Sequence, residues 1–80
     1  IKLYINIRDL KFLDLLDNIS KFKGDIYLKT ENNDKYYLNG TLAIFVVKSK
    51  YFQNELKNAK VVLNNEEDKK IITEYLEKSS

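Results

Sequence analysis

This chain contains no histidine and no cysteine, which removes most of the side chains with which a small protein does chemistry. Chemistry that needs an imidazole or a thiol is therefore excluded. Asp14 and Asp17 lie three positions apart, and Glu66, Glu67 and Asp68 are consecutive. Paired carboxylates can act as acid and base or hold a metal, but without histidine or a buried setting they are typical of a solvated helix face. The sequence predicts no catalytic residue, no metal site, no cofactor and no enzyme activity.

The elements that hold these side chains fit one domain, 1–80, because a chain of 80 residues has room for one core. No stretch approaches the roughly 18 apolar residues of a membrane span, and the first residues lack a secretory pattern. The absence of cysteine excludes a disulfide framework. We therefore expect a soluble protein of a reducing cytoplasm, without a membrane contact. The abundance of Lys, Asn and Ile is typical of an AT-rich bacterial genome.

The first half of the chain predicts a strand, a helix and a hairpin. Residues 1–7 alternate strictly, which places their isoleucines and leucine on one face of a strand. Asp9 is predicted to cap the following helix, and Gly24 is placed to end it. The apolar face of that helix consists of Phe12, Leu16, Ile19 and Phe22. Residues 25–30 and 35–38 are short alternating runs joined by a polar turn, as in a hairpin.

The second half adds three further elements. Residues 42–47 are an apolar run that fits a buried strand or a short buried helix, and the preceding turn favours a helix. Residues 59–63 predict a strand, and the acids of 66–68 suit the positive end of a last helix. The order β-α-β-β-α-β-α predicts an α+β fold, in which a four-stranded, mostly antiparallel sheet carries three helices on one face.

Three segments of the sequence resemble a known family. They are residues 21–28, residues 38–40 with the short apolar element that follows them, and residues 61–68 with the apolar residues of the predicted last helix. Together they resemble HPr, the phosphocarrier of the bacterial sugar phosphotransferase system, over about residues 10–78. The resemblance implies an open-faced sandwich of the HPr type. It also implies, for members of that family, a phosphoryl group carried on a histidine at the start of the first helix.

The chain departs from the family at both phosphorylation positions. Arg8 stands at about the position of the phosphorylated histidine, and a permanently protonated guanidinium cannot be a nucleophile. Asp9 beside it can accept phosphate in principle, but helix capping is the favoured role. The regulatory serine corresponds to Leu42; Thr41 is one place early and is favoured as a plain N-cap. We expect an HPr-like domain that is not a functional phosphocarrier.

A binding or regulatory module is the first functional hypothesis. The resemblance places four residues in the region where the family meets its partners: Arg8, Lys11, Leu42 and Ala43. It implies a protein partner from the sugar phosphotransferase system or from carbon regulation.

The outer face of the predicted sheet supplies the alternative. Strand alternation predicts these outward residues: Lys2, Tyr4, Asn6, Tyr27, Lys29, Lys35, Tyr37, Lys60 and Val62. Tyrosines among lysines fit plain strand surface, a protein contact or homo-oligomer interface through Tyr4, Tyr27 and Tyr37, or a platform for single-stranded nucleic acid. The net charge of +2 argues against nucleic acid, because affinity there comes largely from phosphate neutralisation.

Overall fold

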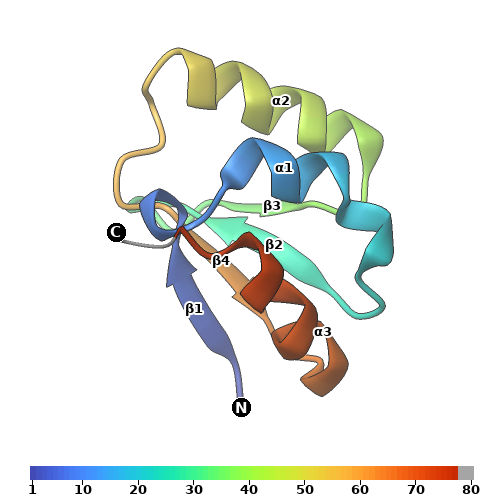
Figure 1. Cartoon of the computed structure of the whole chain (residues 1–80). Coiled ribbons are helices and arrows are strands. Elements are labelled where there is room, and N and C mark those ends of the chain that lie inside the picture. Colours follow the sequence, from blue (N-terminus) through green and yellow to red (C-terminus); the bar gives the residue numbers. More distant parts are fainter. Residues whose placement is uncertain (78–80) are drawn as a thin grey trace.

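A computed structural model describes residues 1–77 (Figure 1). The strands are β1 (Leu3–Asn6), β2 (Ile26–Lys29), β3 (Lys35–Tyr37) and β4 (Lys60–Leu63). The α-helices are α1 (Phe12–Asp17), α2 (Thr41–Phe52) and α3 (Glu66–Ile71), and the 3-10 turns are η1 (Ile7–Asp9), η2 (Ile19–Lys21) and η3 (Ile72–Tyr75). The predicted α+β class, with a four-stranded open sheet and three helices, is confirmed. Within the described residues, no helix has both the length and the apolar character needed to span a bilayer.

The sheet has the strand order β1-β4-β2-β3, and all three pairings are antiparallel. The two central strands, β4 and β2, therefore lie between the first and third strands of the chain. Leu28 of β2 faces Val61 of β4 on one side and Tyr36 of β3 on the other. Because side chains alternate along each strand, this register decides which residues share a face.

The inner face of the sheet and the helices share one hydrophobic core. The strands contribute Ile26, Leu28, Val61 and Leu63, all fully buried. The helical segments contribute Phe12, Leu15, Val47 and Ile72, which are buried to the same degree. In Figure 1, α1 and α2 lie side by side over the sheet. Figure 1 also shows that the two helices run in opposite directions, and the Phe12 and Tyr51 rings, 5.2 Å apart, bring the start of α1 to the end of α2.

Helix α1 is shorter than the sequence predicts. Asp9 is not its cap: Asp9 is the last residue of η1, and α1 begins three positions later without a side-chain cap. The helix ends at Asp17 because Asn18 leaves helical geometry (φ −116°, ψ 22°) and its Nδ2 donates to the Asp14 carbonyl at 2.8 Å. An asparagine amide that competes for a carbonyl of the last turn is a known helix terminator. Gly24 lies beyond η2, in the loop to β2, and does not end the helix.

The apolar run at residues 42–47, for which the sequence allowed a strand or a helix, lies in helix α2, which has twelve residues. Thr41 is not its N-cap. Gly40 holds the cap position with extended backbone (φ −106°, ψ 137°), its carbonyl accepts the Ile44 N–H at 3.1 Å, and no side chain caps the helix. Thr41 is therefore the first helical residue and not the cap.

Candidate functional site

The outward side of α2 is apolar and uncovered. Its exposed side chains are Leu42 (80% exposed), Phe45 (73%), Val46 (40%) and Phe52 (70%), a set called here the α2 face. Their spacing places them on one side of a helix. The opposite side of α2 packs on the core through the fully buried Val47. The helix is therefore apolar on both sides, a pattern typical of a buried helix, although only one side is buried here.

The charges next to the α2 face are already paired. Lys48 Nζ lies 3.2 Å from a carboxylate oxygen of Asp17 in α1, and Lys50 Nζ lies 3.6 Å from Glu55. These contacts leave the apolar stripe without a strong charge of its own. A surface of this kind suits an uncharged, apolar partner surface.

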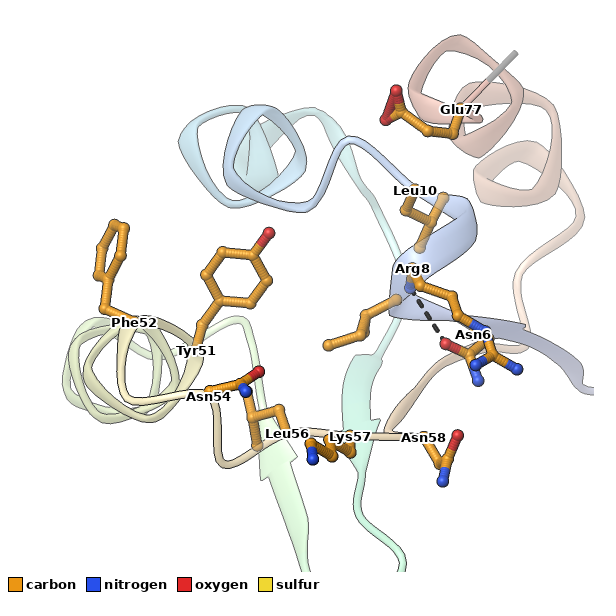
Figure 2. A pocket seen from close by; sticks show the side chains of 11 residues that line it. Asn6, Arg8, Leu10, Tyr51, Phe52, Asn54, Leu56, Lys57, Asn58 and Glu77 are labelled. Carbon is orange, nitrogen blue, oxygen red and sulfur yellow. Dashed lines mark hydrogen bonds between the residues drawn. The ribbon is translucent and has the colours of Figure 1, made fainter. Parts of the chain in front are cut away.

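Arg8 lines a pocket of about 870 Å³ between η1, the end of α2 and the segment that leads to β4. Figure 2 shows Tyr51 and Phe52 on one side of this pocket and Arg8 and Leu10 on the other. The backbone of Arg8 is held by Asn6, whose Oδ1 accepts the Arg8 N–H at 3.0 Å. Among residues 1–77 the Arg8 guanidinium forms no ion pair. It can attract an anion, but it supplies no nucleophile.

The other residues of the predicted docking region do not gather around Arg8. Lys11 is exposed just before α1, and its N–H donates to the Tyr75 carbonyl at 2.7 Å. Leu42 and the half-buried Ala43 lie at the opposite end of α2 from the pocket. Ten residues of helix span about 15 Å, so the structure brings Phe52, not Leu42, to Arg8.

The tyrosines of the outer sheet face lie in one row across the strands, because Tyr4 faces Val62, Val62 faces Tyr27, and Tyr27 faces Tyr37. Tyr4 and Tyr37 are 48% and 51% exposed, as strand alternation predicts. The prediction that Tyr27 and Val62 are exposed is wrong: they are 7% and 0% exposed. Both lie on central strands, where side chains from the neighbouring strands cover them.

Tyr27 is covered by a ring and two cations. The Tyr37 ring lies 5.3 Å away, and the Nζ atoms of Lys2 and Lys35 lie 5.8 and 5.3 Å from the Tyr27 ring centroid. Lys2 Nζ also donates to the Tyr27 hydroxyl at 3.4 Å, and this hydrogen bond raises the pKa of Lys2 above its ordinary value. The Tyr27 side chain therefore packs beneath Tyr37, Lys2 and Lys35 and is not accessible for direct contact with a partner.

The acidic cluster divides into two roles. Glu66 and Glu67 are exposed, and hydrogen bonds to Lys69 and Lys23 lower the pKa of each carboxylate. Asp68 is fully buried, so the prediction of a solvated acidic face fails at this residue. Among the described residues, no three His, Cys, Asp or Glu side chains are grouped to hold a metal ion.

We compared the chain with models of protein families, with curated proteins and with solved structures. None of them matches. A functional argument for this chain therefore rests on its own surfaces.

Sequence reasoning missed three of the four residues of the α2 face: Phe45, Val46 and Phe52. The signal was present, because apolar residues recur there three and four positions apart. It was hidden by Ala43, Ile44 and Val47, which belong to the inner side of the same helix and make the run look uniformly apolar.

Proposed function

We propose that this chain is a protein-binding module of HPr-like architecture that carries no phosphoryl group, and that a partner protein docks on the α2 face. The single observation that carries the docking proposal is the 70–80% exposure of Leu42, Phe45 and Phe52 on one side of one helix. The HPr-like part is supported by the element order and by the sequence segments that resemble the family.

The size of the α2 face supports docking. A phenylalanine side chain buries about 150–250 Å², so at these exposures the two phenylalanines alone offer roughly 200–350 Å² of apolar surface. With Leu42 and Val46 the patch reaches the size of functional patches on monomeric proteins. Aromatic side chains are also enriched among the residues that dominate protein interfaces.

The partner is expected to present an apolar groove or helix face to α2. In this proposal the partner belongs to the sugar phosphotransferase system or to carbon regulation, in the cytoplasm, as the family resemblance implies. Arg8, which lies in η1 across the pocket from the end of α2, is an additional cation for the rim of the interface.

The docking proposal is tested by capture from a lysate with the Phe45→Ser/Phe52→Ser variant. Serine and phenylalanine have similar helix propensities, and both side chains are mostly exposed, so α2 is expected to stay folded. We expect proteins retained by the wild type to fall at least tenfold with this variant, by quantitative mass spectrometry. The Tyr4→Ser/Tyr37→Ser variant, altered on the outer sheet face, should retain them.

Equal capture by the wild type and the α2 variant would contradict docking at this face. Light scattering of the same proteins distinguishes self-association from binding of a different protein. A second copy docked on the α2 face would double the mass of the wild type and not that of the variant.

The absence of phosphoryl transfer is a separate prediction. After incubation with phosphoenolpyruvate and enzyme I of the sugar phosphotransferase system, intact-mass spectrometry should show no phosphorylated form. The physical reason is that Arg8 stands where the family has its nucleophilic histidine. An HPr from the same reaction mixture is the positive control. A stable mass increase of one phosphoryl group on this chain would refute this part of the proposal.

A further inference from the structure

Three lysines stand side by side across the outer face of the sheet. Lys60 of β4 faces Lys29 of β2, and Lys29 faces Lys35 of β3. None of the three forms an ion pair among residues 1–77. Like charges directly opposite each other on a sheet are destabilising. Lys35 lies over the Tyr27 ring, with its Nζ 5.3 Å from the ring centroid. A bound anion would relieve the remaining repulsion between the three lysines.

The lysine row continues into a shallow depression of about 660 Å³. Arg8, Lys29 and Lys60 line it, together with side-chain amides and the hydroxyl of Thr30. Glu31 is the acid among its lining residues, and its Oε1 accepts a hydrogen bond from Asn58 at 2.7 Å. The depression has three positively charged side chains and one carboxylate, which is already hydrogen-bonded, so its local charge is positive. The net charge of +2 for the whole chain does not reveal this local excess.

An exposed aromatic ring borders the same depression. Tyr4 is 48% exposed and lines the depression together with Arg8 and Lys60. Lys60 is the diagonal neighbour of Tyr4 across the β1–β4 pair, because Tyr4 faces Val62 and Lys60 lies two residues away along β4, a distance of about 7–8 Å. That distance is within reach of one nucleotide, with its base on Tyr4 and its phosphate at the cations. An acidic peptide would use the cations and leave the ring without a role.

We propose that the outer face of the sheet binds single-stranded nucleic acid, with phosphates held by Arg8, Lys29 and Lys60 and a base stacked on Tyr4. Open sheet faces with exposed aromatic rings and nearby cations bind single strands by this combination of stacking and charge. Tyr27 stays beneath this surface and supports Tyr37 and Lys35. The four residues of the α2 face take no part in this surface, and Arg8 is the residue that both proposals use. Because the tests alter Phe45 and Phe52 in one case and Lys29, Lys60 and Tyr4 in the other, either proposal can fail while the other holds.

The test is fluorescence anisotropy with labelled oligothymidine and oligouridine of about 15 nucleotides, which span more than one binding site of this size. We expect saturable binding at low salt. The logarithm of the association constant should fall against the logarithm of salt concentration with a slope of about −2, as for three phosphates neutralised on a single strand.

Two variants separate charge from stacking. Lys29→Gln/Lys60→Gln should weaken binding at least tenfold and reduce the slope to about −0.7, because two phosphate contacts are lost. Tyr4→Ala should weaken binding about tenfold at every salt concentration and leave the slope unchanged, because stacking is not ionic. The matched control is Lys21→Gln/Lys70→Gln, which removes the same charge from the helical side and should stay within about twofold of the wild type.

Circular dichroism checks that each variant is folded. The proposal is overturned if the wild type gives no anisotropy change at low salt, or if the sheet variant binds as tightly as the control variant. It is also overturned if labelled oligoglutamate binds more tightly than the oligonucleotides and Tyr4→Ala has no effect, because the occupant would then be an acidic protein.

Discussion

Replacing Asp68 by alanine is expected to destabilise the protein by about 3 kcal/mol, because two backbone N–H groups lose a charged acceptor. Asp68 is fully buried. Its Oδ1 accepts the Lys23 N–H and its Oδ2 accepts the Gly24 N–H, both at 2.8 Å. These bonds fasten the loop before β2 to α3, 44 and 45 residues away in the chain. The carboxylate of Asp68 therefore holds together two segments that are distant in the sequence.

The measurement is urea unfolding followed by circular dichroism. Glu67→Ala is the matched control, since Glu67 precedes Asp68 in the same helix and makes an exposed ion pair with Lys23 at 2.9 Å. We expect little change for the control, because exposed pairs contribute little. Asp68→Asn should lie between the two, because the amide keeps one acceptor oxygen. If Asp68→Ala and Glu67→Ala unfold at the same urea concentration, the structural role given to Asp68 is wrong.

Replacing Gly24 by alanine is expected to cost about 2 kcal/mol, because the added methyl group has no room. A Cβ built on Gly24 would lie 2.7 Å from the Cβ of Asn65 and 3.3 Å from Asp68 Oδ2. Asn65 cannot move away freely, since its Oδ1 caps α3 by accepting the N–H groups of Glu67 and Asp68 at 2.9 and 3.2 Å. The loop or the helix must shift, and the bonds to Asp68 lengthen with it.

Gly40→Ala provides the comparison within the same chain. A Cβ at Gly40 would meet only the Tyr37 carbonyl oxygen, at 3.9 Å, which is ordinary contact. Its φ of −106° is accessible to alanine, so the change should stay within about 1 kcal/mol, the cost of a poorer N-cap residue. Thermal and urea unfolding of both variants measure the difference. Equal losses of stability for the two glycine variants would show that close approach at Gly24 does not limit the fold.

The sheet was largely predictable because strand signals are local. The alternation of residues 1–7 predicts β1, and the polar turn between residues 30 and 35 predicts the β2–β3 hairpin. In the structure Lys29 faces Lys35 in this hairpin. Alternation also assigned each strand residue to its face. It could not show that Tyr27 is covered, because that depends on Lys2, which lies 25 residues away in the chain, as well as on Tyr37 of the same hairpin.

The roles of the three neighbouring acids could not be predicted from their sequence. Glu66, Glu67 and Asp68 look alike locally, and only the contact with the loop at Gly24 distinguishes Asp68. The same limit applies to α2. Its apolar run predicts burial, but whether a second layer covers its outward side depends on the rest of the fold, and here nothing within residues 1–77 covers Phe45.

Site-specific photo-crosslinking tests the central claim, docking on the α2 face, most directly. A photoreactive phenylalanine analogue is placed at position 45 in one protein and at position 37, on the outer sheet face, in another. The account predicts a covalent adduct with the same partner protein from position 45 and none with that partner from position 37. An adduct with that partner from position 37 alone, or from neither position, would contradict it.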